Sequence, residues 1–219
     1  PAPGRGSGWT FGLMLTPAAF EVMALAFAER AASHAPSWVW VPASDNGPLL
    51  APAAGFLRSA AILVPPPPVS GLDPAPSDAG LVDESVDDDD AAAVRASPSA
   101  HRLELHIVYS ETYRVPVLLL QGYGDDGRPW RGEAVRAHLG RCATADDASL
   151  PLEMVSQMEH PVLRIPFCCL HPCRTADLMT CLLSGDGAKL DYLSAWWSVV
   201  APHVGVRGGA ARFAAQLNR

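Results

Sequence analysis

Apolar and polar residues alternate most regularly between residues 101 and 109. The apolar positions recur at every second residue, as in a half-buried strand: Leu103, Leu105, Ile107 and Tyr109. Residues 113–121 are a second β-rich run, and the short connection at residues 110–112 predicts an antiparallel hairpin. Pro116 in the second run favours an edge position or a bend, because proline has no N–H for the ladder. Turn-forming residues at 122–129 end this strand.

Helical spacing of apolar residues predicts further elements on both sides of the hairpin. Thr16 followed by Pro17 is typical of a helix cap with proline at the first helical position. An apolar stripe at helical spacing follows, up to residues 34–36: Phe20, Met23, Ala24, Phe27, Ala28 and Ala31. We also expect helices at residues 133–139, 175–183 and 190–200.

Short apolar runs complete the pattern. Residues 37–41 and 60–64 are predicted strands, and residues 163–170 form an extended run that leads into His171, Pro172 and Cys173. The order is a helix, then strands as a meander, then helices. We therefore predict one α+β domain over residues 1–219, with an antiparallel sheet covered by helices.

Residues 65–100 differ from the rest of the chain. Four consecutive prolines and a Ser/Pro/Ala/Gly mixture leave little to bury, so we expect a disordered, acidic insertion. It holds eight acidic residues and one basic residue, which accounts for the net charge of −7. The remaining chain is balanced and offers no net charge to nucleic acid or to an anionic membrane. The insertion is either a docking tail for a basic partner or a solvated loop between strands, and we favour the loop.

The hydrophobic runs and the cysteines of the sequence indicate in which cellular compartment the protein works. The sequence contains no apolar run of the roughly 18–20 residues that span a bilayer, so we expect no membrane insertion. Its N-terminus does not resemble a secretory signal. There are five cysteines, four of them between residues 168 and 181, which is not a spaced disulfide framework. We expect free thiols in a reducing, cytoplasmic compartment.

Cys173 lies between an extended run and a predicted helix. Pro172 disfavours helical backbone at His171, and Thr175 is a candidate helix cap. The Cys173 sulfur would then lie just outside a helix N-terminus, which favours a thiolate and an oxyanion. Spacing alone leaves two readings open, a nucleophile for acyl transfer or an ordinary small buried residue.

Other chemistries fit these residues less well. Cys168 and Arg174 have the spacing of a phosphatase loop, but Pro172 removes one of the backbone donors such a loop needs. The cysteines and His171 are too closely spaced to close one zinc tetrahedron, so we expect no metal. A papain-like protease usually needs an asparagine, and asparagine occurs only at positions 46 and 218.

Longer motifs around Cys173 resemble the autophagy conjugating enzymes, distant relatives of the ubiquitin-conjugating enzymes. Gln157-x-Glu159-His160-Pro161, Pro166-Phe167 and His171-Pro172-Cys173 followed by Thr175 resemble the branch of autophagy-related protein 10 more than that of autophagy-related protein 3. The hairpin and the tail match too, at Tyr109-Ser110, Tyr113, Val115-Pro116-Val117-Leu118, Tyr192-Leu193-x-x-Trp196, Val200-x-Pro202 and Val204-Gly205. The resemblance covers residues 103–206 well, the N-terminal third loosely, and the acidic insertion not at all.

The resemblance implies a ubiquitin-conjugating-enzyme-like fold and a cysteine-dependent transferase without a cofactor. Cys173 would accept autophagy-related protein 12 as a glycyl thioester from the activating enzyme, autophagy-related protein 7. It would then pass the modifier to a lysine of autophagy-related protein 5. Ubiquitin enzymes stabilise the oxyanion with an asparagine in a His-Pro-Asn motif ahead of the cysteine. This chain has no asparagine between positions 46 and 218. Backbone N–H groups, His171, Thr175 or Tyr113 would therefore have to stabilise the oxyanion.

Two alternatives to this function remain. A conjugating-enzyme-like module could bind a modifier or acceptor without catalysis, although the presence of Cys173 argues against it. The related branch conjugates a modifier to phosphatidylethanolamine and needs a membrane-binding element. The helix predicted after Thr16 has too few basic residues to serve as one.

Overall fold

An antiparallel sheet of seven strands forms the centre of the computed structural model, which describes residues 14–32, 36–43, 54–67, 101–142, 155–183 and 191–206. The strands are β1 (Trp38–Pro42), β2 (Gly55–Ser59), β3 (Ile62–Val64), β4 (His101–Ser110), β5 (Val115–Tyr123), β6 (Val155–Glu159) and β7 (Pro166–Leu170). They lie in the order β1-β2-β4-β5-β7-β6, and β3 pairs with β4 beside this path. This arrangement confirms the predicted α+β class.

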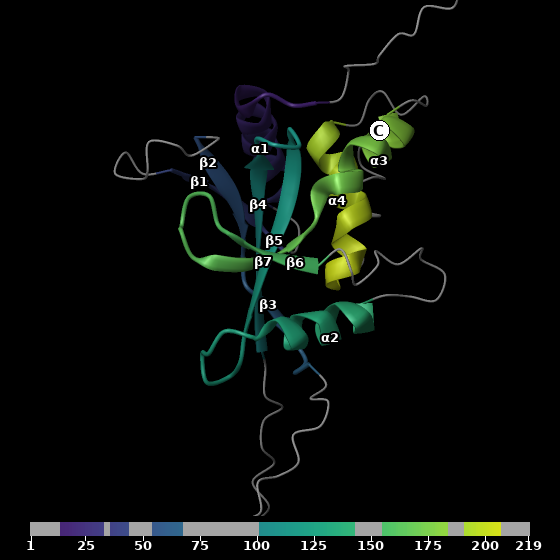
Figure 1. Ribbon diagram of the computed structural model, residues 1–219. Coiled ribbons are helices and arrows are strands. Elements are labelled where there is room, and N and C mark those ends of the chain that lie inside the picture. Colours follow the sequence, from purple (N-terminus) through teal and green to yellow (C-terminus); the bar gives the residue numbers. More distant parts are fainter. Residues whose placement is uncertain are drawn as a thin grey trace, which may run out of the picture.

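Helices cover one face of the sheet (Figure 1). They are α1 (Pro17–Ala31), α2 (Gly132–Cys142), α3 (Thr175–Leu183) and α4 (Tyr192–Val200), with short 3-10 turns η2 (Pro172–Arg174) and η3 (Ala201–Val204). The main core lies between this face and the helices. A smaller core lies on the opposite face under the turn between β6 and β7: Phe56, Val108, Val117, Leu119, Phe167 and Cys169.

Helix α1 begins as its sequence predicts. The Thr16 side chain accepts a hydrogen bond from the Ala19 N–H at 3.1 Å, and Pro17 occupies the first helical position. Phe20 and Phe27 are fully buried and pack their rings against Trp40 and Trp38 of β1. Each buried phenylalanine contributes about 2 kcal/mol of hydrophobic stabilisation, so this face anchors α1 on the sheet.

The β4–β5 hairpin is confirmed, with two corrections. Strand β4 is not half-buried, because His106 and Val108 are buried on the second face as well. Strand β5 is central rather than at an edge. Pro116 is tolerated near its start because the β5–β7 register pairs involve only Leu119 and Leu120, further along the strand.

Several element boundaries differ from the predictions. Strands β2 and β6 were not predicted, because one contains Gly55 and Arg58 and the other is mostly polar, and pairing with neighbours defines both. The predicted strand at residues 60–64 is reduced to β3, and residues 163–165 belong to a turn before β7. The acidic insertion lies outside the described residues from position 68 onwards.

Candidate active site around Cys173

Cys173 lies at the junction between the sheet and helix α3. Strand β7 ends at Leu170, His171 is extended with φ −62° and ψ 128°, and the chain then enters η2 and α3. Pro172 favours extended backbone at the residue before it, His171, and is well suited to the first position of a helical turn. The Cys173 side chain is exposed, so its thiol is open to a protein partner.

His171 caps this helical segment. Its Nδ1 accepts a hydrogen bond from the Cys173 N–H at 3.2 Å. The prediction that Thr175 is the cap is wrong. Thr175 has helical backbone with φ −64° and ψ −41°, and its N–H donates to the Pro172 carbonyl. The reason is that η2 continues directly into α3, which moves the first capping position back to His171.

Tyr113 reaches His171 from the turn between β4 and β5, 58 residues earlier in the chain. The Tyr113 hydroxyl lies 3.5 Å from His171 Nε2, and the rings meet edge-on with centroids 5.4 Å apart. Tyr113 was predicted to lie in a strand, but β5 begins two residues later. The turn before it is closed by Arg114, whose N–H donates to the Ser110 carbonyl at 2.7 Å.

The contacts of His171 determine its tautomer. Because Nδ1 accepts a hydrogen bond, a neutral ring carries its proton on Nε2. Nε2–H therefore points towards the Tyr113 oxygen, and the Tyr113 hydroxyl keeps its own hydrogen to donate elsewhere. Tyr113, His171 and the Cys173 backbone thus form one connected group, whereas Thr175 lies on the first turn of α3.

The two cysteines of β7 are poor nucleophiles. Cys168 belongs to the main core and Cys169 to the smaller core, so their side chains lie on opposite faces of the sheet. Burial is the largest cause that raises the pKa of both thiols. A metal site shared by Cys168, Cys169 and Cys173 is excluded by this placement. No cluster of three or more candidate metal ligands occurs within the described ranges.

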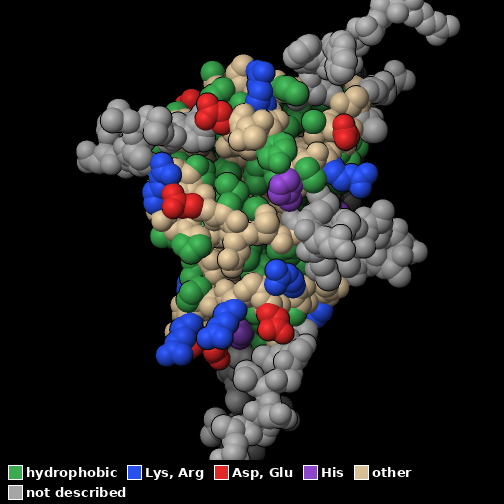
Figure 2. Space-filling model, in the orientation of Figure 1, with side chains coloured by type: hydrophobic (Ala, Val, Ile, Leu, Met, Phe, Trp, Pro, Cys, Tyr) green, Lys and Arg blue, Asp and Glu red, His purple; other side chains and the backbone are tan. Residues whose placement is uncertain are grey.

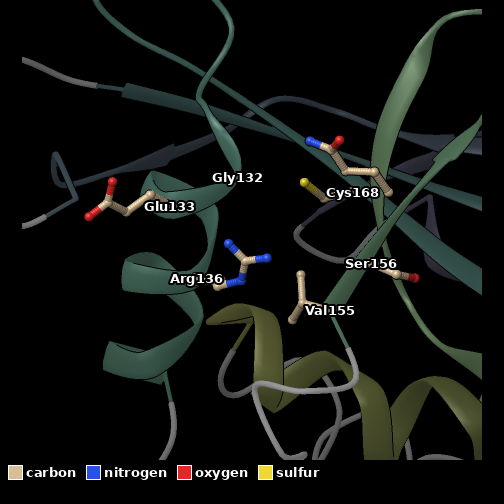
Figure 3. A pocket seen from close by; sticks show the side chains of 7 residues that line it. Gly132, Glu133, Arg136, Val155, Ser156 and Cys168 are labelled. Carbon is tan, nitrogen blue, oxygen red and sulfur yellow. The ribbon is translucent and has the colours of Figure 1, made fainter.

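A polar cavity of about 420 Å³ lies between α2 and β6, with Cys168 at its wall (Figure 3). Its lining residues are Gly132, Glu133, Arg136, Val155, Ser156, Gln157 and Cys168. Arg136 points into this space while Glu133 points away (Figure 3). The cavity does not include Cys173, His171 or Tyr113, so it is separate from the candidate active site.

The face of the molecule seen in Figure 2 is not dominated by one charge. Figure 2 shows hydrophobic side chains gathered near the middle of the visible face and charged side chains of both signs towards its margins. Tyr113 is exposed to 39% despite its contact with His171. The exposure of both Cys173 and Tyr113 suits a reaction between proteins more than one on an enclosed small molecule.

The antiparallel sheet covered by helices fits the conjugating-enzyme fold, and the comparisons with known proteins show the class, a ubiquitin-like conjugating transferase. The family model described as "Autophagocytosis associated protein, active-site domain" matches residues 26–208. The chain is 31% identical over 212 residues to the ubiquitin-like-conjugating enzyme ATG10 of Arabidopsis thaliana, covering 88% of this chain and 92% of that protein. The chain therefore belongs to the ATG10 family of ubiquitin-like-conjugating enzymes of autophagy.

Matches to other relatives are shorter. The chain is 32% identical over 124 residues to ATG10 of Homo sapiens, covering 55% of this chain and 56% of that protein. It is 33% identical over 111 residues to autophagy-related protein 3 of Yarrowia lipolytica, covering 49% of this chain and 29% of that protein. Within the described ranges, no helix combines the length and apolar character needed to cross a membrane.

Proposed function

We propose that Cys173 carries autophagy-related protein 12 as a thioester and passes it to a lysine of autophagy-related protein 5. The observation that carries this proposal is that Cys173 is exposed and its backbone N–H is bound by His171, which in turn contacts Tyr113, while Cys168 and Cys169 are buried. The modifier would arrive from autophagy-related protein 7. The proposed compartment is the cytoplasm, where a reducing environment keeps the Cys173 thiol available.

The first step exchanges one thioester for another. The Cys173 sulfur attacks the carbonyl of the modifier's C-terminal glycine, which is held as a thioester on the activating enzyme. A new carbon–sulfur bond forms on Cys173 and the old one breaks, so the proton that Cys173 loses returns to the thiol of the activating enzyme. Cys173 is exposed in the 3-10 turn that continues into α3, so its sulfur is accessible to the incoming thioester.

The second step is aminolysis. A neutral lysine amine of the acceptor attacks the same carbonyl, a carbon–nitrogen bond forms, Cys173 leaves as a thiolate and the amine nitrogen loses a proton. The tetrahedral intermediate carries an oxyanion that needs a donor. The Cys173 N–H is already used by His171 Nδ1, so we assign this role to the Tyr113 hydroxyl, which His171 holds in place.

The test compares cysteine-to-serine variants with activating enzyme, ATP and modifier, on gels run with and without thiol. Wild type should form a thiol-labile adduct, and Cys173→Ser should form a thiol-resistant oxyester instead, because serine is a poorer leaving group for aminolysis. Cys168→Ser and Cys169→Ser are matched controls that should keep the thiol-labile adduct. Normal conjugation by Cys173→Ser, with loss in either control, would identify a different nucleophile.

Two further arms separate the alternatives. The loaded enzyme should form an isopeptide with autophagy-related protein 5 and should not modify vesicles that contain phosphatidylethanolamine. Modification of the lipid instead would favour the branch that acts on membranes. A protein that binds the modifier but never forms an adduct on Cys173 would be a binding module.

A further inference from the structure

Leu15, which precedes the cap of helix α1, has both its backbone N–H and its backbone carbonyl in hydrogen bonds to distant residues. The Leu15 N–H donates to the Arg114 carbonyl at 2.8 Å, and the Leu15 carbonyl accepts from the Tyr109 hydroxyl at 2.8 Å. Leu15 and Tyr109 are both buried, so these hydrogen bonds are protected from competing water. The two bonds tie the start of α1 to strand β4 and to the turn that follows it.

Arg114 has a backbone conformation that needs such support. Its φ of 54° lies in the left-handed region, which side chains with a Cβ atom adopt rarely. The Arg114 N–H is bound to the Ser110 carbonyl and its carbonyl to the Leu15 N–H. Backbone strain of this kind persists where the surroundings hold the residue on several sides. Leu15 is therefore part of what holds the turn in shape.

We propose that Tyr109 and Leu15 are positioning residues of the active site. They hold Arg114 in the left-handed conformation, and Arg114 in turn directs its neighbour Tyr113 towards His171. Contacts connect Tyr109, Leu15, Arg114, Tyr113, His171 and Cys173 in that order. Without the Leu15 hydrogen bonds, Arg114 relaxes to an ordinary conformation and Tyr113 turns away from the His171 ring.

This inference rests on the proposed function only for its effect on the reaction, because the placement of Tyr113 can be observed without any reaction. Tyr109→Phe removes the hydroxyl and keeps the ring that packs 5.8 Å from Phe20. Tyr192→Phe is the matched control. Within the described residues the buried Tyr192 hydroxyl has no hydrogen-bond partner, so its removal breaks no such bond.

The direct readout is the NMR signal of the His171 ring, which senses the neighbouring Tyr113 ring. In Tyr109→Phe this signal should move towards its position in Tyr113→Ala, while Tyr192→Phe should leave it unchanged. In turnover assays, Tyr109→Phe should slow transfer to the acceptor by about threefold to tenfold, the effect of one lost hydrogen bond, and leave thioester formation intact. An unchanged His171 signal in Tyr109→Phe overturns the proposal.

A second pair of variants tests the same turn without changing the buried tyrosine. Arg114→Val places a β-branched residue in the left-handed region, and Arg164→Val does so in the β6–β7 turn, where φ is 58°. Both should lower the melting temperature, but only Arg114→Val should shift the His171 signal. Equal shifts in both would show a general loss of stability and contradict the proposal. A shift in Tyr109→Phe with normal transfer by Tyr113→Ala would retain the positioning and refute only the role proposed for Tyr113.

Discussion

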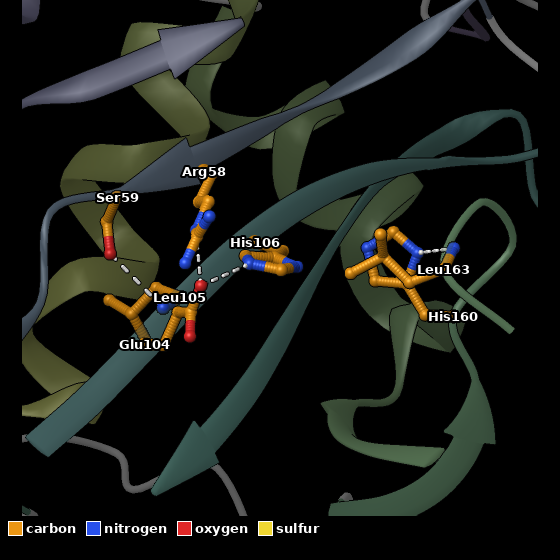
Figure 4. A network of polar contacts seen from close by, with 7 residues as sticks. All are labelled: Arg58, Ser59, Glu104, Leu105, His106, His160 and Leu163. Carbon is orange, nitrogen blue, oxygen red and sulfur yellow. Dashed lines mark hydrogen bonds and ion pairs between the residues drawn. The ribbon is translucent and has the colours of Figure 1, made fainter. Parts of the chain in front are cut away.

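Outside the candidate active site, two buried histidines, His106 and His160, make polar contacts with a nearby glutamate and with a turn, respectively. His160 Nδ1 accepts hydrogen bonds from the N–H groups of Val162 and Leu163, both at 3.1 Å, and so holds the β6–β7 turn (Figure 4). The edge of its ring lies against His106, whose Nε2 contacts Glu104, which pairs in turn with Arg58. Among the described atoms, His106 Nδ1 and His160 Nε2 have no hydrogen-bond partner, and Figure 4 shows them facing each other.

This arrangement predicts a loss of stability in acid. Burial, together with a smaller contribution from the neighbouring His106, lowers the pKa of His160 to about 3. The unfolded chain has the ordinary histidine pKa of about 6.5 and therefore binds more protons below that pH. His160 should thus reduce the free energy of unfolding by about 2 kcal/mol between pH 7.5 and pH 5.

The measurement is denaturant unfolding of wild type and His160→Asn across this pH range. Asparagine keeps an acceptor for the two turn N–H groups but does not titrate. The variant should therefore lose less stability than wild type on acidification, whatever its stability at pH 7.5. Parallel pH profiles for the two proteins would contradict the assignment. The pKa of His106 and of His138 is also lowered by burial, so part of the slope should remain in the variant.

At the scale of elements, β3 and β4 form the two sides of a hairpin whose connection is the acidic insertion. Val64 pairs with His101 in the register of these strands, so the chain leaves and returns at the same place. Arg141 of α2 donates to the carbonyls of Pro65 and Pro66 at 3.0 and 2.7 Å. The insertion therefore joins two strand ends that already lie side by side, so its length is not needed to connect them.

Deletion of residues 66–96 should consequently leave the fold intact. It leaves five residues between Val64 and His101, a length common in hairpins. Closing the shorter loop costs less entropy, which stabilises the folded state by about 1–2 kcal/mol. The melting temperature should therefore rise or stay close to that of wild type. Thermal unfolding and charging by the activating enzyme provide the check. A large fall in melting temperature, or loss of charging, would argue against a solvated loop.

For the whole molecule, the basic residues are almost all arginines. Lys189 is the single lysine of the sequence and lies outside the described residues. An arginine side chain stays protonated, so it cannot attack a thioester as a lysine amine can. A lysine ammonium has a pKa of about 10.4 and reacts only where a site favours its neutral form near the carbonyl. Nothing in the sequence around Lys189 suggests such a site.

We therefore expect that the loaded enzyme without acceptor decays mainly by slow hydrolysis and that added acceptor converts the thioester into a thiol-resistant isopeptide. Mass spectrometry of the loaded enzyme over time provides the measurement. A Lys189→Arg variant is the matched control and should decay at the same rate. Rapid transfer of the modifier to Lys189 in the absence of acceptor would overturn this expectation.

Local patterns in the sequence were sufficient for α1 with its Thr16 cap, the β4–β5 hairpin and the helices that became α2, α3 and α4. They left Cys173 open between a nucleophile and a small buried residue, and the choice of nucleophile rested on the family resemblance. The predicted elements depend on residues within a few positions of one another, where periodicity and capping act. Strands β2 and β6 could not be found in this way, because their mixed composition becomes a strand only when β1, β4 and β7 provide hydrogen-bond partners.

The tertiary structure alone decided how the site is assembled. It made His171 the cap in place of Thr175, buried Cys168 and Cys169 on opposite faces of the sheet, and brought Tyr113 to His171 from 58 residues away. It also joined Leu15 to Arg114, 99 positions apart in the sequence, by a backbone hydrogen bond. Such contacts depend on how the elements pack, and no pattern along the chain encodes which distant backbone group will be the partner.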